Sequence, residues 1–434
     1  MTVNKRTSDL LKILPSDDIL IQCMHCGMCL ATCPTYNVDF NERSSPRGRI
    51  RLIKSLAEGK LDVTETFINE MNYCLDCQAC ETACPAGVKY GAMVEAARDI
   101  ITKSKKGSFG AKYIQRFALH YIVGSKINIK IVGKLLYFYQ NYGIEWLVNK
   151  IFGLFIPLKL MVEMNKMTPR ISPVFSDSLI KEVTDPNGEI KYRVIVPTGC
   201  IMNVAFAYIN IDTVEVLKQN NCRIICPPKQ SCCGSLMAHY GELDLAKKLA
   251  KETIDQFSQH DYDYIVSNSA GCAAYMKEYG HIFEDDPVYS EKAKILSRKV
   301  KEVTEFLSLT GVNAQLHPVN ETVTYHDACH LCHTQKITKE PRALLNQIPG
   351  LQIKPLDESM WCCGSAGIYN VLRYDDSMKF LKRKMDNIKN TGAETVVTGN
   401  PGCMGQIQYG AEKFKIPVKV IHPVSLLKKS LENK

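Results

Sequence analysis

The chain has 434 residues, which is too long for one ordinary domain and predicts about two to four. Its 45% hydrophobic and 23% charged residues, with a net charge of +9, are typical of a soluble globular protein. No apolar run approaches the roughly 18 residues of a membrane-spanning helix, and residues 1–20 lack the apolar core of a signal peptide. Nineteen cysteines, an odd number, argue against a closed set of disulfides. We therefore expect a cytoplasmic chain whose cysteines are mostly thiolate metal ligands.

Two cysteine motifs lie near the N-terminus, CMHCGMCLATCP at residues 23–34 and CLDCQACETACP at residues 74–85. Both have the spacing C-x2-C-x2-C-x3-C-P, which is typical of a ferredoxin with two 4Fe–4S clusters. In that pattern three cysteines of one loop bind one cluster, and the fourth binds the other. The predicted ligands are Cys23, Cys26, Cys29 and Cys84 for one cluster, and Cys33, Cys74, Cys77 and Cys80 for the other. Two structural zinc sites are the alternative. We expect a mainly helical domain over residues 1–103.

A basic helix is predicted between the two motifs, at residues 44–59, and Pro46 is suited to its first turn. Its basic residues are Arg47, Arg49, Arg51 and Lys54. They form either a solvated face or a positive field that stabilises reduced clusters. His25, inside the first cysteine loop, is expected to be exposed or hydrogen-bonded rather than a ligand.

A basic aromatic segment follows, predicted as a helical linker over residues 104–188. Residues 101–170 hold twelve Lys or Arg, two acidic residues and no cysteine, a net charge of +10. One interpretation is a linker packed against its own domains. The other is contact with a membrane surface or an acidic partner, with Lys126, Lys130 and Lys134 facing the anionic surface. Nothing in the chain resembles a nucleic-acid-binding module.

The remaining sequence contains a tandem repeat. Short β-branched runs alternate with helical stretches, which predicts α/β domains with mainly parallel sheets over residues 189–312 and 313–434. In the first half, 31 residues separate Cys200 from the Cys232–Cys233 pair, and 38 separate that pair from Cys272. In the second half, 32 and 39 residues separate Cys329, Cys362–Cys363 and Cys403. This agreement indicates a duplication.

Each half places its four cysteines at the predicted carboxyl ends of strands, where open α/β sheets bind ligands. We therefore predict one or two further iron–sulfur clusters, with buried structural cysteine as the alternative. Cys222 and Cys226 fall outside the repeat and are expected in the core, whereas Cys332 remains a candidate for an extra ligand. The flanking histidines, His326, His330 and His333, are either hydrogen-bonded scaffold or neighbours of a cluster or quinone.

A two-cluster ferredoxin module followed by two Cys-Cys-Gly (CCG) domains resembles the iron–sulfur subunit of glycolate oxidase and the lactate-utilisation iron–sulfur proteins. The segments SPRGRIRLI and CPAGVKYG carry the resemblance to the glycolate oxidase type. It implies an FAD-containing partner that oxidises a small 2-hydroxy acid, while this chain passes electrons to a quinone or another acceptor. No G-x-G-x-x-G fingerprint follows a predicted strand, so we expect the flavin on the partner and no catalysis by this chain alone. The implied location is cytoplasmic, with peripheral contact at the inner face of the membrane.

The sequence departs at two positions from the cysteine pattern of a related family. Heterodisulfide reductase subunits end each CCG motif with Cys-x-x-Cys, and their noncubane clusters reduce a disulfide. Here Tyr275 and Gln406 stand where those fifth cysteines would be. A catalytic disulfide reductase is therefore the alternative function, and a scaffold with purely structural clusters is a third. Four cysteines per half are suited to an ordinary 4Fe–4S cluster.

Overall fold

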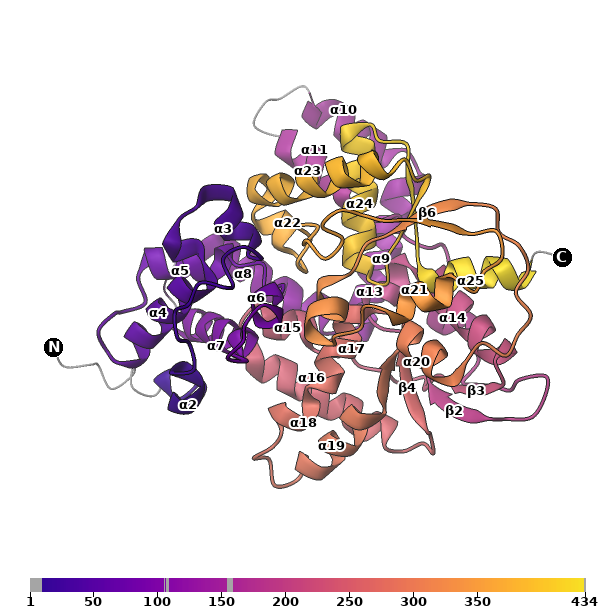
Figure 1. Ribbon diagram of the computed structural model, residues 1–434, viewed down its shortest axis with the longest axis horizontal. Helices are drawn as coiled ribbons and strands as arrows, with labels where there is room; N and C mark the ends of the chain where they lie inside the picture. Colours follow the sequence, from indigo (N-terminus) through magenta and orange to yellow (C-terminus); the bar gives the residue numbers. More distant parts are fainter. Residues whose placement is uncertain (1–9, 105, 107–108, 154–158, 433–434) are drawn as a thin grey trace.

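The computed structural model describes residues 10–104, 106, 109–153 and 159–432 (Figure 1). The N-terminal helices lie to one side of the two sheet-containing halves. Among the residues described, no helix combines the length and the apolar character needed to cross a bilayer.

The N-terminal module is helical, as predicted, and no strand occurs in its described residues. Its core is formed by side chains such as Ile53, Phe67 and Met93, which are fully buried. The basic helix begins at Pro46, and the preceding Ser45 side chain caps it by accepting a hydrogen bond from the backbone N–H of Gly48. The helices are α2 (Asp17–Leu20), α3 (Pro34–Asp39), η1 (Glu42–Ser44), α4 (Pro46–Ala57), α5 (Glu65–Tyr73), α6 (Ala79–Thr82) and α7 (Tyr90–Lys103).

The basic middle segment is also helical where it is described. It consists of α8 (Phe109–Phe117), the π-helix η2 (Ala118–Val123), α9 (Lys126–Asn141), α10 (Ile144–Gly153), α11 (Lys159–Met167) and α12 (Ser176–Leu179). Helix α9 packs on a helix of the first half, α13 (Ile201–Ala205), and α11 packs on a helix of the second half, α24 (Pro401–Phe414). The segment therefore spans both halves.

Each half is built on its own sheet, and both sheets are mainly parallel, as predicted. The first has the order β1-β3-β2-β4-β5, in which only β1 is antiparallel, and the second has the order β7-β6-β8-β9 and is wholly parallel. The first sheet contains β1 (Val183–Thr184), β2 (Tyr192–Ile195), β3 (Cys222–Ile225), β4 (Tyr264–Ser267) and β5 (Val300–Glu302). The second contains β6 (Thr322–Tyr325), β7 (Gln352–Lys354), β8 (Thr395–Val397) and β9 (Lys419–Ile421). Strand β1 extends the first sheet into the segment assigned to the linker.

Helices cover both sheets. The first half contributes α13, α14 (Ala207–Gln219), α15 (Ser235–His239), α16 (Leu243–Phe257), α17 (Ala270–Lys277), α18 (Tyr279–Ile282), α19 (Ser290–Lys299) and α20 (Val303–Thr310). The second contributes the π-helix η4 (His330–Thr334), α21 (Glu340–Leu345), α22 (Tyr369–Leu372), α23 (Tyr374–Thr391), α24 and α25 (Pro423–Glu432). Helices α18 and α19 have no counterpart among the described residues of the second half.

The two halves pack reciprocally. Helix α14 of the first half packs on α25 of the second, and α21, the second-half equivalent of α14, packs on α20 of the first. The ends of β4 and β8 meet at this interface, where Ala270 N donates to Gly399 O at 3.1 Å and the side chain of His422 bonds to Asn268 O at 2.9 Å. This reciprocity is the signature of a self-complementary interface, here within one chain. It brings the cysteine-bearing edges of both sheets together.

Candidate metal centres

All nineteen cysteines lie in the described part of the chain, and all are free thiols. The sixteen predicted ligands fall into four groups. We call them the first ferredoxin set (Cys23, Cys26, Cys29, Cys84), the second ferredoxin set (Cys33, Cys74, Cys77, Cys80), the first CCG set (Cys200, Cys232, Cys233, Cys272) and the second CCG set (Cys329, Cys362, Cys363, Cys403). Four thiols that converge without disulfides are a donor set suited to an iron–sulfur cluster.

The first ferredoxin set lies at the protein surface. Its four cysteines line one small cavity, and Cys26 is exposed. Left-handed backbone at His25 and Gly27 curls the loop that carries three of them. Arg47 holds this loop in place, because its Nη1 donates to His25 O at 3.0 Å. Of the four basic residues of α4, Arg47 therefore does lie beside the cysteines, and His25 is exposed as expected.

The second ferredoxin set is buried, apart from the half-buried Cys77. Burial raises the pKa of Cys80, and the nearby Cys77, Cys74 and Cys33 raise it further. The backbone N–H of Asp76 and the hydroxyl of Tyr90 both donate to Cys74 Sγ, at 3.3 and 3.4 Å. The fourth cysteine of each motif thus lies with the other motif, which is the arrangement that the exchanged ligand sets require.

A second basic residue of α4, Arg49, lies near the second ferredoxin set. It is fully buried, and it donates to Glu70 O at 2.7 Å and to Thr35 Oγ1 at 3.1 Å. Thr35 Oγ1 in turn lies 3.2 Å from Cys33 Sγ. Arg51 is exposed, whereas Arg47 and Arg49 lie beside the cysteines; a field that stabilises reduced clusters stays a prediction for these two.

The first CCG set gathers around the end of β2. Cys200 directly precedes α13, and its Sγ lies 3.7 Å from Cys232 Sγ. Cys272 lies in the first turn of α17. Hydrogen bonds with Cys232 and Cys272, followed by burial, raise the pKa of Cys233, so all four thiols form one interacting group.

The second CCG set repeats this geometry at the end of β6. Cys329 directly precedes η4, and Cys403 lies in the first turn of α24. The backbone N–H of Gly364 donates to Cys362 Sγ at 3.4 Å, and Asn400 Nδ2 donates to Cys403 Sγ at 3.7 Å. Hydrogen bonding with Cys363 and burial raise the pKa of Cys403.

The glycine of each CCG motif explains the adjacent cysteine pair. Gly234 and Gly364 have φ of 91° and 87°, in the left-handed region that favours glycine. A Cβ at Gly234 would lie 2.8 Å from Ala246 O, and one at Gly364 would lie 2.7 Å from Ser377 O. The chain therefore turns sharply against a helix further along, α16 in the first half and α23 in the second, and this turn presents both cysteines of the pair to one site.

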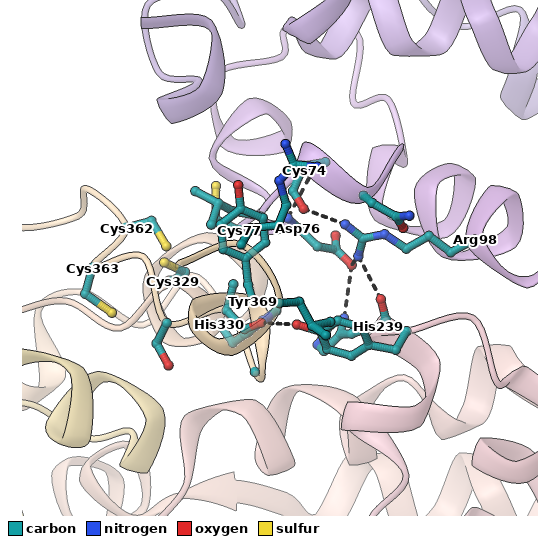
Figure 2. A pocket seen from close by; sticks show the side chains of 18 of the residues that line it. Cys74, Asp76, Cys77, Arg98, His239, Cys329, His330, Cys362, Cys363 and Tyr369 are labelled. Carbon is teal, nitrogen blue, oxygen red and sulfur yellow. Dashed lines mark hydrogen bonds and ion pairs between the residues drawn. The ribbon is translucent and has the colours of Figure 1, made fainter. Parts of the chain in front are cut away.

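A cavity of about 410 Å³ joins the ferredoxin module to the second half. Its lining includes Cys74 and Cys77 of the second ferredoxin set together with all four cysteines of the second CCG set (Figure 2). Burial and then the charge of Cys329 raise the pKa of Cys77, and both thiols line the same cavity, so they lie close enough to interact electrostatically across the module boundary. The two CCG sets also adjoin, because Gly271 N donates to Asn400 Oδ1 at 3.3 Å.

A charged group beside this cavity was not predicted from the sequence (Figure 2). The Nδ1 of His239 bonds to Asp76 Oδ2 at 3.0 Å and Glu95 Oε1 at 2.8 Å, and Arg98 Nη1 donates to His239 O at 2.7 Å. Burial opposes a charge here, but the bonds to Asp76 and Glu95 outweigh it and raise the pKa of His239 to about 10. The group ties the ferredoxin module to the first half. No motif reveals it, because its members lie far apart in the chain.

Six candidate residues remain, three cysteines and three histidines, and their surroundings differ. Cys222 and Cys226 lie in the hydrophobic core, as predicted. Cys332 is buried, with its Sγ 3.8 Å from Cys329 O. His330 and His333 are scaffold residues: His330 bonds to Thr334 Oγ1 at 3.2 Å and stacks on His239, and His333 bonds to Thr82 Oγ1 at 3.1 Å. His326 differs from both, as described below.

Comparison with known proteins supports these assignments of modules. Residues 19–88 match the family described as 4Fe-4S dicluster domain, and residues 194–277 and 323–408 match the cysteine-rich CCG domain. A probable glycolate oxidase iron–sulfur subunit of Bacillus subtilis (strain 168) is 38% identical over 418 residues, 94% of this chain and 93% of that protein. The chain belongs to the family of glycolate oxidase iron–sulfur subunits. This iron–sulfur subunit is therefore an electron-transfer component of an oxidoreductase.

Two further relatives support the assignment. The glycolate oxidase iron–sulfur subunit of Escherichia coli (strain K12) is 27% identical to this iron–sulfur subunit over 424 residues, 97% of this chain and 96% of that protein. Lactate utilization protein A of Exiguobacterium sp. (strain ATCC BAA-1283 / AT1b) is 33% identical over 237 residues, which is 54% of this chain and 96% of that protein. The predicted family and fold class are both confirmed.

Proposed function

We propose that this iron–sulfur subunit takes electrons from an FAD-containing subunit that oxidises a small 2-hydroxy acid of the glycolate or lactate type, and passes them to a quinone or another acceptor. The names of the relatives support the substrate class. The observation that carries the relay is the serial order of the four cysteine sets. The first ferredoxin set reaches the surface at Cys26, and the second ferredoxin set adjoins the second CCG set through Cys77 and Cys329.

The sixteen cysteines are proposed to hold four iron–sulfur clusters, each of which takes up and releases one electron. The exposed first ferredoxin set is suited to electron entry, because electrons from a partner must cross the subunit interface. The buried sets are suited to storage away from water. The isolated chain is expected to have no dehydrogenase activity, since the flavin is expected on the partner.

The test is anaerobic reconstitution with the flavoprotein subunit. Addition of the 2-hydroxy acid should reduce flavin first and then the clusters, and the chain should contain about sixteen iron atoms by cluster stoichiometry. Cys77→Ser should slow reduction of the CCG clusters while flavin reduction survives, whereas Cys222→Ser, in the core, should not. Clusters that stay oxidised while flavin is reduced contradict the proposal. Reduction of a disulfide by the isolated chain with a ferredoxin donor would favour the alternative function.

We also propose peripheral contact with the membrane, where a quinone is dissolved. The supporting observation is an apolar stripe on the outer face of α9, formed by Ile127, Ile131, Leu135 and Phe138, each more than half exposed. The three lysines expected to make this contact all have partners within the chain; Lys126 and Lys130 are half-buried, and Lys134 is exposed. Lys126 and Lys130 pair with Asp177 at 3.3 and 3.1 Å, and Lys134 donates to Pro173 O at 2.7 Å. The linker interpretation therefore describes the lysines, and the stripe is the better candidate for lipid contact.

Vesicle sedimentation tests this contact. The double variant Ile131→Glu and Leu135→Glu should lose binding to anionic phospholipid vesicles, because it places two charges on the apolar stripe. Val288→Glu, an equally exposed apolar position in the first half, is the matched control. Equal binding by all three proteins, or no binding by the unaltered chain, would contradict the proposal.

A further inference from the structure

The two CCG sets have cysteines at matching positions, but the residues around those cysteines differ. His326 is the third residue before Cys329, and Pro197 is the third residue before Cys200. The duplicated architecture therefore places an imidazole at the end of β6 and a proline, which has no donor atom in its side chain, at the end of β2. This is a chemical difference between two otherwise matching sites.

His326 is fully buried, and among the described residues neither ring nitrogen has a hydrogen bond of good geometry; the ring interacts with the thiol of Cys363, a member of the second CCG set. Most buried polar groups in native folds are hydrogen-bonded, and one that is not calls for an explanation such as a water molecule, an ion or a functional role. His330 and His333, in the same segment, do have side-chain partners. The ring of His326 is thus held where only a group at the second CCG set can satisfy it.

The neighbours of that ring are two thiols. A ring nitrogen of His326 and the Sγ atoms of Cys363 and Cys403 all lie within 4.8 Å of one another, and all three residues are buried. Two sulfur atoms and one nitrogen at such spacing can bind a single metal ion. Histidine replaces cysteine on one iron of certain iron–sulfur centres, which shows that the ligand type is compatible with this chemistry.

We propose that His326 is a nitrogen ligand of the iron–sulfur cluster at the second CCG set, a fifth protein ligand beside Cys363 and Cys403, so that one of the four irons carries two protein ligands. This rests on the proposed function, in which that set holds a cluster. The first CCG set then holds its cluster by thiolates alone. Because histidine ligation raises the potential of an iron–sulfur centre, the second CCG site becomes the more easily reduced of the two. Electrons leaving the second ferredoxin set would then collect at the adjoining site.

Pulsed EPR of the anaerobically reduced subunit tests the proposal. The signal of the second CCG cluster is first identified as the one that Cys403→Ser removes or alters. In the unaltered protein this signal should carry a directly bound nitrogen coupling that changes when the protein is labelled with 15N-histidine. His326→Cys should abolish the nitrogen coupling, retain the iron and lower the midpoint potential. His330→Gln, which lines the same cavity, should leave the coupling intact.

The possible outcomes distinguish an error about the ligand role of His326 from an error about the cluster at the second CCG set. A cluster signal that responds to Cys403→Ser but shows no histidine nitrogen overturns the ligand role of His326 alone. A nitrogen coupling that persists in the His326→Cys variant also overturns the ligand role of His326 alone. If Cys403→Ser changes neither the iron content nor any signal, the second CCG set holds no cluster, and both this inference and that part of the proposed function are wrong. The labelling experiment uses the unaltered protein, so it decides the question even if His326→Cys fails to fold.

Discussion

At the scale of single residues, the CCG glycines show how a short motif brings two cysteines to one place. Each combines left-handed backbone with a close approach to a helix further along the chain, α16 or α23, so no side chain fits there. The motif is therefore a folding requirement as much as a source of thiols. Its adjacent cysteines point to one site because the turn at the glycine holds them there.

Replacement of Gly364 by alanine should destabilise the second half by about 3 kcal/mol, as the sum of left-handed strain and a steric overlap with Ser377 O. The control is Gly392→Ala, where φ is 63° but a Cβ would meet no atom within 4 Å, and the expected cost is about 1 kcal/mol. Urea unfolding of both variants measures the difference. Equal costs would show that the close approach has no energetic effect. Iron analysis should also find less iron in the Gly364 variant only.

Lys384 is a buried cation beside the second CCG set. Its Nζ donates a hydrogen bond to Ser359 O at 3.2 Å. Burial lowers the pKa of Lys384, and the neighbouring thiolates of Cys363 and Cys329 oppose that shift. A positive charge near a cluster stabilises its reduced, more negative state. Lys384→Met should therefore lower the midpoint potential of the second CCG cluster by roughly 60 mV, a tenfold change in a one-electron equilibrium. The exposed Lys382→Met is the control, and a redox titration showing equal potentials would contradict the expectation.

At the scale of elements, helix α9 shows where the charges of a basic segment lie. Its lysines bond to Asp177 and Pro173, as the linker interpretation expects. Its exposed face combines the apolar stripe with Lys134. The net charge of a segment does not reveal which face of a helix carries the charged side chains. The residues that pair with those side chains come from elsewhere in the chain.

Helix α20 begins with a capping box in which the buried Glu302 accepts from Thr304 N at 2.7 Å. Burial raises the pKa of Glu302 to about 7, although the bonds from Thr304 partly oppose the shift. The folded state thus holds this proton more tightly than the unfolded state, whose pKa is near 4.5. The resulting stability is present below pH 4.5 and is lost as the pH rises through 7.

Glu302→Gln removes this titration while keeping an oxygen that can cap the helix. Relative to the unaltered protein, the variant should gain roughly 3 kcal/mol of stability between pH 4.5 and pH 8, because each pKa unit corresponds to about 1.4 kcal/mol. Urea unfolding at several pH values gives the two stability curves. Parallel curves would show that Glu302 does not titrate in this range.

At the scale of the whole molecule, reciprocal packing holds the two halves together while a charged group docks the ferredoxin module. Helices α14 and α25, and α21 and α20, form the interface between the halves. The ferredoxin module meets the halves through Asp76, Glu95 and Arg98, which converge on His239. This docking sets the approach of Cys77 to Cys329.

His239→Gln should loosen the docking, because it removes the cation bonded to both Asp76 and Glu95 and leaves Asp76 with Arg98 alone, at 3.6 Å. We expect a cost of about 3 kcal/mol, in the range for breaking a buried ion pair. Hydrogen exchange should increase in α7 and α15, the helices that carry Arg98 and His239, and not in β6 or β8. His281→Gln, an exposed histidine paired with Glu284, is the control and should leave exchange unchanged. Because the pKa of His239 is about 10, the contact should persist from neutral pH to about pH 9.

The sequence by itself determined the two ferredoxin motifs, the tandem repeat, the mainly parallel sheets and the core positions of Cys222 and Cys226. These features are local: a cluster requires several thiols within a short loop, and a parallel α/β unit requires alternating strands and helices. Spacing along the chain is therefore enough to detect them. Spacing also predicts which fourth cysteine binds the cluster of which motif, and that assignment stays a prediction.

Only the tertiary structure decided which sites adjoin and which side chains surround them. The cavity shared by Cys77 and Cys329, the group around His239, the paired lysines of α9 and the buried ring of His326 beside Cys363 all join segments far apart in the chain. Their energies come from burial and charge at packed interfaces, which depend on how whole elements dock rather than on neighbours in sequence. For this reason the two CCG sites, alike in their motifs, became chemically distinct only once the fold brought His326 to one of them.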